Sequence, residues 1–557
     1  MKSLTKEIRA YALKNAIEFG KAEAGRILPK LFQHGLDRKE IKSIMPEIES
    51  IVSEVNKLGK EEKKRDYENL KEYVKEKADE EKGLPELPNA SDKMVFRLAP
   101  YPSGALHLGN TKTYLLNALY AEKYKAKTLL IMDDTIGSEE KRIVPDAYGL
   151  IEEAFKWLGV KYEKPVIYKS DRVEIYYNYA EELIEKDKAY VCKCIQEVLR
   201  KNREEGKDCK CRKRSISENK KLWKEMFKMK QGEAVLRIKT SMQHPNPAFR
   251  DRVLFKISDN EHPRVGNKYR VWPSLEMSWT VDDHLLGITH ILRGNDLMIE
   301  TDMEKFIWDI FGWKHPEAIH TGMIKIEGVD GKLSKSKAQK EVQSGEFTGW
   351  EDPRTWSMQS LRRRGIKAEA IREFVEEIGL NKQDIIVPID SLYAHNRKMI
   401  DNIANRYSFV NNPVRLKING APEIKKVEVP IHPDREEKRE IKAGKEIFIS
   451  KDDFDNLKGQ EIRLLHLYNI KLGRKAIKNI VKSDFTSEEV KQVPKINWVS
   501  VGVKTNVLKP DGTWIEGIAD EGIRDLKQGT MIQFERFGFC RFHCVKKNNY
   551  EFWFAHK

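Results

Sequence analysis

The sequence predicts a multidomain α/β protein with a parallel nucleotide-binding sheet, an insertion in that sheet, and all-β segments towards the C-terminus. Three observations carry this prediction. Strand-like and helix-like segments alternate over residues 93–190, and the same pattern returns over 271–349. Residues 128–132 (TLLIM) form the short apolar run typical of a buried parallel strand. After residue 413, short strand-like segments separated by turn residues predict β-barrels.

Residues 1–82 are predicted to be helical and charged. Asp37 and Glu40 have capping-box spacing and precede a stripe of apolar residues at helical period: Ile41, Ile44, Met45, Ile48, Ile51, Val52 and Val55. Pro46 falls inside that stripe, so the helix is expected either to kink or to restart there. Residues 83–92 are proline-rich and predict a linker.

Residues 97–110 (RLAPYPSGALHLGN) follow a predicted strand at 94–96 and lead into a predicted helix at 111–124. A strand that ends in such a turn and restarts as a helix presents backbone N–H groups at the helix N-terminus, a site suited to a phosphate chain. His107 and Asn110 are three residues apart, so both side chains can face one bound phosphate.

Two carboxylates, Asp133 and Asp134, follow the apolar run 128–132 directly. They therefore lie at the carboxyl end of a strand, where open α/β sheets hold their ligands. An alternative role for the pair is to cap the next helix.

The insertion is predicted to span residues 191–270 and to carry a basic helical stretch and a strand. Within it, Cys192, Cys194, Cys209 and Cys211 form two CxC pairs. Disulfides are not expected in a cytosolic protein. The four thiolates therefore either close a tetrahedral zinc site or remain four reduced thiols.

A second basic motif, residues 332–336 (KLSKS), follows an Asp-Gly turn. Lys332, Ser334 and Lys335 place two cations and a hydroxyl on one loop, which suits a mobile clamp on a transferring phosphate group. An isolated match of this kind in a Lys-rich chain is equally well a solvated loop.

Composition favours a polyanionic partner. The net charge of the chain is +15 and its pI is about 9.1. Such an excess favours RNA, although a Lys/Glu-rich surface has the same signature. No window approaches the roughly 18 apolar residues of a membrane span, and the N-terminus lacks the apolar core of a signal peptide. We therefore expect a cytoplasmic protein without a membrane partner.

The two motifs resemble the signatures of class I aminoacyl-tRNA synthetases. Residues 97–110 resemble the HIGH signature in its glutamyl/glutaminyl form, Pro-x-Pro-Ser-Gly-x-Leu-His-x-Gly, with Asn110 where a second His is usual. Residues 332–336 resemble the KMSKS signature with Leu333 in the Met position. Residues 349–354 resemble a Gly-Trp-Asp-Asp-Pro-Arg segment common in the same family. The chain thus resembles an archaeal-type glutamyl-tRNA synthetase over nearly its whole length.

This resemblance implies a Rossmann-like catalytic core of the HIGH superfamily and assigns a part to each region. The implied parts are a helical N-terminal appendage (1–82), a linker (83–92), the first half of the catalytic domain (93–190), an acceptor-stem-binding insertion (191–270), the second catalytic half with the KLSKS loop (271–349), a helical connector (350–412) and an anticodon-binding β-barrel region (413–557).

The resemblance also implies an activity and its site residues. ATP, with Mg²⁺, and L-glutamate would form glutamyl-adenylate, and the glutamyl group would pass to tRNA(Glu), or also to tRNA(Gln) as in many archaeal relatives. The implied catalytic residues are His107, Asn110, Lys332 and Lys335. The implied ATP-binding residues are Ser103, Gly104, His107, Gly109, Asn110, Ser334 and Lys335, and those implied for glutamate are Arg97, Asp133 and Arg293. Some family members carry a comparable zinc motif in the insertion, and a monomer is expected.

One residue separates glutamate from glutamine within the family. Glutamyl enzymes carry Arg at the position of Arg293, whereas glutaminyl enzymes typically carry a small uncharged residue there. Arg293 can instead bind a phosphate or a surface acid. A further departure is Leu275, where many relatives have a Tyr that touches the substrate. Glutaminyl-tRNA synthetase and a non-catalytic tRNA-binding paralogue remain the alternative functions.

Overall fold

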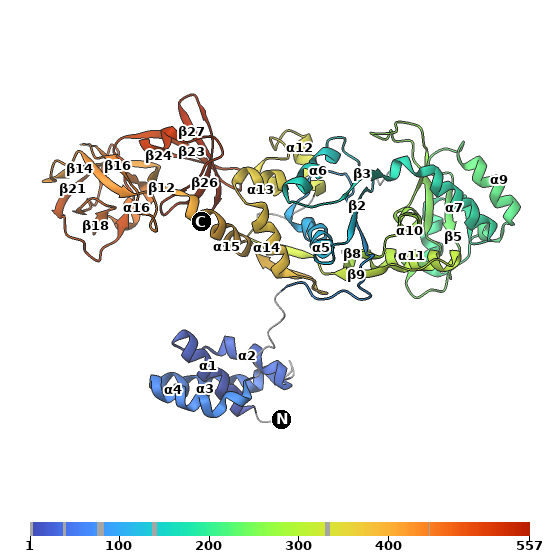
Figure 1. Ribbon diagram of the computed structural model, residues 1–557, viewed down its shortest axis with the longest axis horizontal. Coiled ribbons are helices and arrows are strands. Elements are labelled where there is room, and N and C mark those ends of the chain that lie inside the picture. The colour runs from blue at the N-terminus through green and yellow to red at the C-terminus, as the bar shows by residue number, and fades with distance from the viewer. Residues whose placement is uncertain (1–3, 37–39, 75–82, 136–141, 329–334, 445) are drawn as a thin grey trace. The chain divides into compact units, whose positions relative to one another are not determined.

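The computed structural model describes residues 4–36, 40–74, 83–135, 142–328, 335–444 and 446–557 (Figure 1). It divides into two compact units, residues 1–82 and 83–557. Every helix in these described ranges is too short or too polar to cross a membrane.

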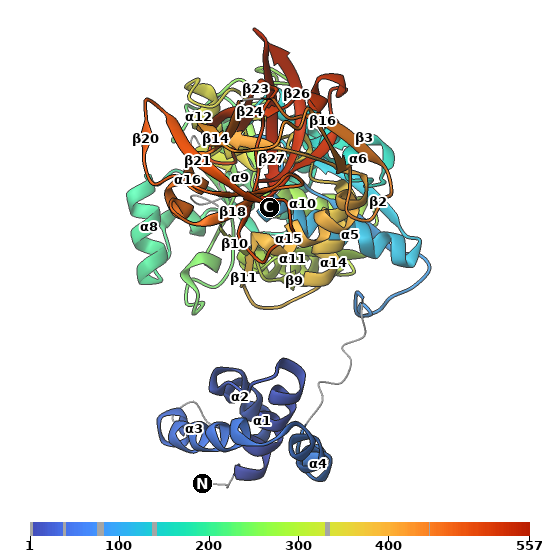
Figure 2. The same cartoon turned by 90° about the vertical axis from the view of Figure 1, so that its left-hand side faces the viewer.

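The N-terminal unit consists of helices, as Figure 2 shows. They are α1 (Thr5–Phe19), α2 (Ala24–Leu31), α3 (Ile41–Lys57) and α4 (Lys60–Leu70), and α1 contacts the other three. The apolar stripe of α3 is buried against α1 through Ile48 and Val55. One continuous helix contains Pro46, so the helix does not restart there. α4 buries none of its residues, as expected for a run of lysine and glutamate.

A five-stranded parallel sheet forms the core of the second unit. Its strands are β1 (Val95–Leu98), β2 (Lys127–Met132), β3 (Glu163–Tyr168), β8 (His290–Gly294) and β9 (Glu317–Thr321), in the order β3-β2-β1-β8-β9. The chain runs outwards from β1 to β3 and later resumes on the other side of β1 at β8. Parallel sheets of this kind bind ligands where the strand order reverses, which here is the boundary between β1 and β8.

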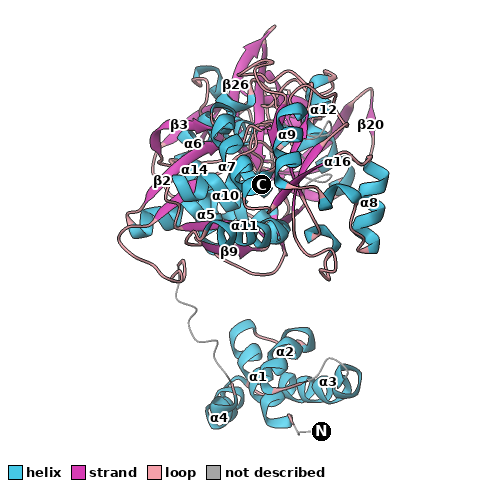
Figure 3. Cartoon of the chain, turned by 90° about the vertical axis from the view of Figure 1, so that its right-hand side faces the viewer, coloured by secondary structure: helices cyan, strands magenta, loops and turns pink. Residues whose placement is uncertain are grey.

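Two helices, α5 (Leu108–Tyr124) and α6 (Ala147–Trp157), share an apolar core with the sheet. Three more, α7 (Val173–Glu185), α10 (Leu275–Leu285) and α11 (Met298–Phe311), contribute to a second core together with residues of the segment 189–257. Figure 3 distinguishes helices from strands by colour. α5 contacts β1, β2 and β8. The run predicted as a buried strand is buried in β2, where Leu130, Ile131 and Met132 have no exposed surface.

The insertion carries its own antiparallel sheet, β4 (Ala189–Cys192), β5 (Val235–Ile238), β6 (Val253–Ile257) and β7 (Val271–Pro273). Helices α8 (Gln196–Glu205) and α9 (Ile216–Met226) lie between β4 and β5 in the chain. The sheet begins at Ala189, two residues before the predicted limit of 191, and ends at Pro273, three residues after the predicted limit of 270.

After β9 the chain forms a helical region. β10 (Ile324–Glu327) pairs in parallel with β11 (Ile385–Pro388), and the helices are α12 (Lys335–Gln343), α13 (Met358–Arg364), α14 (Ala368–Ile378) and α15 (Ile389–Ile400). α14 contacts α5, and the apolar side chains of both helices belong to the same core as β1 and β2.

The C-terminal region is all-β and contains two seven-stranded sheets. One comprises β14 (Pro413–Asn419), β17 (Ile447–Ser450), β18 (Glu461–Leu464), β19 (Asn469–Lys471), β20 (Ala476–Ile477), β21 (Ile480–Ser487) and β22 (Lys495–Ile496). The other comprises β12 (Asn405–Tyr407), β13 (Phe409–Asn411), β23 (Gly502–Leu508), β24 (Trp514–Asp520), β25 (Met531–Phe534), β26 (Gly538–Lys546) and β27 (Asn549–His556). A ribbon of β15 (Lys426–Pro430) and β16 (Lys438–Lys442) and one helix, α16 (Lys451–Leu457), complete the region.

The second of these sheets is nearly closed. Its edge strands, β12 and β13, follow one another in the chain, which brings the two edges of the sheet together. The predicted class, a multidomain α/β protein with C-terminal all-β domains, is confirmed.

Candidate active site

The first motif ends in a helix cap. α5 begins at Leu108, three residues before the predicted start, because His107 is its N-cap. The Nδ1 atom of His107 accepts a hydrogen bond from the backbone N–H of Gly109 at 3.1 Å, and Oδ1 of Asn110 accepts one from the backbone N–H of His107 at 3.1 Å. Since Nδ1 is the acceptor, the hydrogen of the neutral ring lies on Nε2, which is a donor suited to a phosphate oxygen.

The turn before the cap packs against the segment that resembles Gly-Trp-Asp-Asp-Pro-Arg. Gly104 has a φ of +146°, and a Cβ atom there would lie 2.4 Å from the indole ring of Trp350. Only glycine fits at this close approach. Further along the chain, the backbone N–H of Met358, the first residue of α13, donates to the carbonyl of Leu106 at 2.8 Å and joins this turn to α13.

Three predicted glutamate-binding residues lie at the carboxyl ends of adjacent strands. Arg97 lies in β1, Asp133 directly follows β2, and Arg293 lies in β8. Arg97 and Arg293 therefore flank the point where the strand order reverses. The backbone N–H of Asp133 donates to the carbonyl of Pro100 at 3.0 Å, which joins the end of β2 to the first motif.

Arg97 is already paired with a carboxylate of the protein. Its Nε and Nη2 atoms donate to the two carboxylate oxygens of Asp283 in α10 at 2.6 and 3.1 Å. Its guanidinium carbon also lies 3.5 Å from the ring centroid of Trp279. This fork fixes the orientation of the guanidinium.

Arg293 is paired in the same way. Its Nη1 atom donates to Glu304 of α11 at 3.1 Å, and Nη2 contacts the second carboxylate oxygen of the same residue. Both side chains are buried, and burial raises the pKa of Glu304, whereas Arg293 opposes that rise. The Nε atom of Arg293 is buried and has no hydrogen-bond partner among the described residues, so it is a donor that a ligand oxygen can satisfy.

Asp133 is paired with a lysine that we did not predict. The Nζ atom of Lys169 lies 2.9 Å from Oδ1 of Asp133 and donates to Oγ of Ser278 at 2.8 Å. It also lies 3.3 Å from the ring centroid of Trp279, the same indole that Arg97 contacts. Burial lowers the pKa of Lys169, and the nearby carboxylates of Asp133 and Asp282 oppose that shift.

The second motif is only partly described. Lys332 and Ser334 lie outside the described residues, and Lys335 is the first residue of α12. The predicted role of this loop therefore remains a prediction. Ser103, by contrast, is described and buried in the turn that precedes His107.

The sequence analysis did not identify the side chains that contact the predicted glutamate-binding residues. These side chains are Lys169, Trp279, Asp283 and Glu304. Lys169 was detectable, because it directly follows β3 and so lies at the same edge of the sheet as Asp133. Asp283 and Glu304 lie on helices, and a charged residue at a helical position carries no signal of the distant arginine that it faces.

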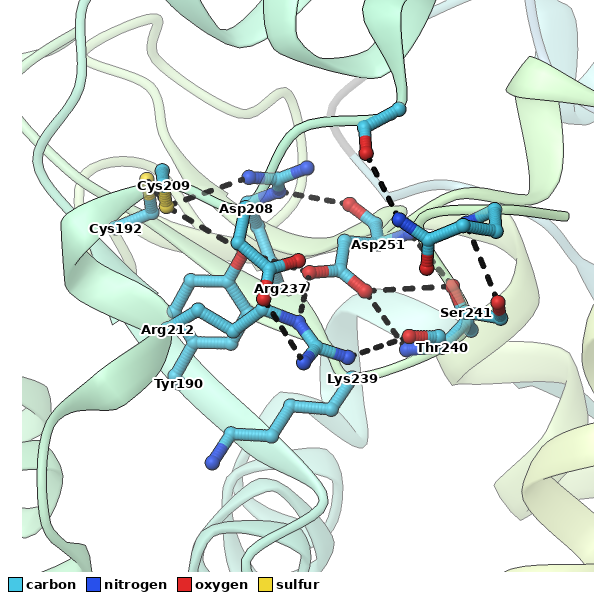
Figure 4. A network of polar contacts seen from close by, with 12 residues as sticks. Tyr190, Cys192, Asp208, Cys209, Arg212, Arg237, Lys239, Thr240, Ser241 and Asp251 are labelled. Carbon is cyan, nitrogen blue, oxygen red and sulfur yellow. Dashed lines mark hydrogen bonds and ion pairs between the residues drawn. The ribbon is translucent and has the colours of Figure 1, made fainter.

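The four cysteines of the insertion lie together, as Figure 4 shows for Cys192 and Cys209. Their sulfur atoms lie within 4.8 Å of one another, with 3.7 Å between Cys192 and Cys209 and 4.0 Å between Cys194 and Cys211. A disulfide would need about 2.05 Å. Tetrahedral zinc with Zn–S bonds of about 2.3 Å places its sulfur ligands about 3.8 Å apart. The spacing therefore fits a metal ion better than disulfides.

Charged and polar groups surround Cys209. Nη1 of Arg237 donates to its sulfur at 3.9 Å, and Oη of Tyr190 lies 3.7 Å from that sulfur (Figure 4). The pKa of Cys209 is lowered, first by the hydrogen bond with Cys192 and further by Tyr190 and Arg237. A buried sulfur next to a guanidinium, with a lowered pKa, is suited to bind a metal ion as a thiolate.

Asp251 connects this cluster to the sheet of the insertion. Its carboxylate accepts hydrogen bonds from Oη of Tyr190 at 2.8 Å, from Nε of Arg212 at 2.9 Å and from the backbone N–H of Thr240 at 2.7 Å. Its carbonyl accepts one from Nε of Arg237 at 2.7 Å. The network therefore holds the turn that carries Cys209 and Cys211 against β4 and β5.

Comparison with known proteins agrees with this geometry. Residues 93–402 match the family of the class I tRNA synthetases (E and Q), catalytic domain, and residues 404–490 and 488–543 match two anti-codon binding domains of the same family. Glutamate–tRNA ligase of Methanocaldococcus jannaschii is 40% identical, with all of both chains covered. The enzymes of the same name from Pyrococcus abyssi and Pyrococcus furiosus are 42% and 41% identical, each over 98% of both chains. Together with the first motif, which follows β1 of the parallel sheet and leads into α5, these matches show that the chain belongs to the class I tRNA synthetases of the E and Q family.

Proposed function

We propose that this protein is a glutamate–tRNA ligase that uses ATP, L-glutamate and tRNA(Glu). The observation that carries the proposal is Arg293, a buried arginine in β8 beside the point where the strand order reverses. The γ-carboxylate of glutamate needs a cation to offset its desolvation, whereas arginine cannot accept a hydrogen bond from the amide of glutamine. The full-length similarity to proteins named glutamate–tRNA ligase supports the same choice.

The amino acid would lie among the three residues at the strand ends. Asp133 is the counterion for the α-ammonium, and Arg97 and Arg293 attract the two carboxylates. Each arginine is held in place by its own carboxylate, Asp283 or Glu304, so the donors are oriented before the substrate arrives. Such preorganisation is typical of sites that rely on position and charge.

ATP, as its magnesium complex, would lie over the N-terminus of α5. Nε2 of His107 and the side-chain amide of Asn110 are donors for its phosphates. Ser103 and Gly104 in the preceding turn and Gly109 in the first turn of α5 complete the proposed ATP site. The α-carboxylate of glutamate attacks the α-phosphorus, and pyrophosphate leaves. Lys332, Ser334 and Lys335 stabilise the negative charge that develops on this leaving group. The 3′-terminal adenosine of tRNA then attacks the glutamyl carbonyl and releases AMP.

Aminoacylation of purified tRNA(Glu) and tRNA(Gln) with either amino acid tests this proposal. We expect glutamate to be attached to tRNA(Glu), and the same assay shows whether tRNA(Gln) is also charged with glutamate. Attachment of glutamine to tRNA(Gln) would make the protein a glutaminyl enzyme. Binding of tRNA without any ATP–pyrophosphate exchange would make it a non-catalytic paralogue.

Zinc is the metal that the thiol cluster fits best. Cys192, Cys194, Cys209 and Cys211 supply four sulfur ligands at tetrahedral spacing, and a site with four thiolates is structural because it leaves no open position for a substrate. The site would carry a net negative charge, which Arg237 partly offsets.

We expect one zinc ion per protein chain in wild-type protein and none in the variant Cys192→Ser/Cys209→Ser. Elemental analysis of protein unfolded and refolded with zinc present measures both. Cys540→Ala is the matched control, because Cys540 is buried in β26, outside the cluster, and this variant should keep its zinc. Equal metal content in wild type and the double serine variant would show that the thiols bind no metal.

A further inference from the structure

Lys169 is the most deeply buried cation of the candidate site. It begins the 3-10 turn Lys169–Asp171 that follows β3, and its side chain has no exposed surface. The described charged groups around it are the carboxylates of Asp133 and Asp282 and the guanidinium of Arg97. Burying an ammonium group requires a large desolvation free energy unless an opposite charge lies next to it. The carboxylate of Asp133 is such a charge and offsets the lost hydration of Lys169.

Three contacts hold the ammonium of Lys169 in place. Nζ lies 2.9 Å from Oδ1 of Asp133, donates to Oγ of Ser278 at 2.8 Å, and lies 3.3 Å from the ring centroid of Trp279. The serine and the indole both belong to α10, whereas Asp133 follows β2. Because the lysine is anchored on α10 as well as on Asp133, it cannot swing into solvent when a ligand arrives. The position of the Lys169 charge next to the carboxylate of Asp133 is therefore fixed.

We propose that Lys169 is a positioning residue for the amino-acid substrate: it holds Oδ1 of Asp133 and thereby directs Oδ2 towards the substrate's α-ammonium. This inference rests on the role proposed above for Asp133. Lys169 does not touch the reacting atoms, so its effect on catalysis passes through Asp133.

The variant Lys169→Met tests the inference, because methionine keeps a long side chain and removes the charge. We expect the KM for glutamate in aminoacylation to rise about tenfold, because the buried ion pair with Asp133 is lost, while the KM for ATP stays unchanged. Thermal unfolding and the KM for ATP show that the variant is folded. Lys164→Met is the matched control, since Lys164 lies in β3 with a side chain that is 63% exposed and pairs with Glu152. It should leave both constants unchanged.

Asp133→Asn, alone and combined with Lys169→Met, shows whether the lysine acts through the carboxylate. We expect Asp133→Asn to raise the KM for glutamate, and the double variant to match Asp133→Asn with no further rise, because two residues that act as one unit are not additive. If the rise in the KM for glutamate in the double variant equalled the product of the rises in the two single variants, the inference would be overturned. An unchanged or lower KM for glutamate in Lys169→Met would overturn it as well. If Asp133→Asn itself left that KM unchanged, the proposed role of Asp133 would fail instead.

Discussion

Replacing Arg293 by cysteine is expected to remove most of the activity with glutamate while activity with glutamine changes little or increases. Truncating one partner of a buried charge pair typically costs roughly 2–5 kcal/mol, which corresponds to a loss of about 30-fold or more in kcat/KM. Glutamine loses less, because the cationic donor that disfavours its amide is gone. Measuring kcat/KM for both amino acids in the same variant gives the change in specificity directly.

Glu304 must be included in that experiment. Its carboxylate is buried and paired with Arg293, so Arg293→Cys alone also leaves an unpaired buried acid. The double variant Arg293→Cys/Glu304→Gln removes that charge and should recover stability without recovering glutamate activity. If Arg293→Cys kept the wild-type kcat/KM for glutamate, both the role of Arg293 and the assignment to glutamate would be wrong.

Removing the imidazole of His107 is expected to slow adenylate formation at least about tenfold, a cautious estimate for the loss of one donor that stabilises developing charge. The structure decides which variant to use. His107 is also the N-cap of α5, and an alanine there would cost about 1 kcal/mol of helix stability in addition. His107→Ser keeps a good N-cap and removes only the ring, so it separates the two effects.

Lys335→Ala is expected to slow the same step to a similar extent, since Lys335 is predicted to face the leaving pyrophosphate. Lys337→Ala, two residues further along α12 and with a side chain that is 64% exposed, is the matched control. The single-turnover rate of adenylate formation, with tRNA present, is measured for all three variants. Wild-type rates in both His107→Ser and Lys335→Ala would reject the nucleotidyl-transfer mechanism.

The sequence predicted elements better than it predicted their ends. The buried strand at 128–132 is found in β2 with one more residue, because a continuous apolar run is a strong signal for a strand covered on both faces. The start of α5 was placed three residues late, because the cap is made by a histidine rather than by the serine, threonine or asparagine that marks most N-caps. Pro46 was expected to kink or restart a helix, and α3 contains it without restarting.

Sequence reasoning alone predicted the fold class, the two motifs, the positions of Arg97 and Asp133 after strands, and the grouping of the cysteines. Each of these follows from local spacing or from the rule that parallel strands end at one edge. The charged partners of the predicted glutamate-binding residues became known from the folded structure: Asp283 for Arg97, Lys169 for Asp133 and Glu304 for Arg293. The folded structure also decided that β12 and β13 join a sheet whose other strands begin at Gly502. Periodicity shows which face of an element is buried, whereas the identity of the residue opposite depends on how distant segments pack, and spacing along the chain carries no record of that.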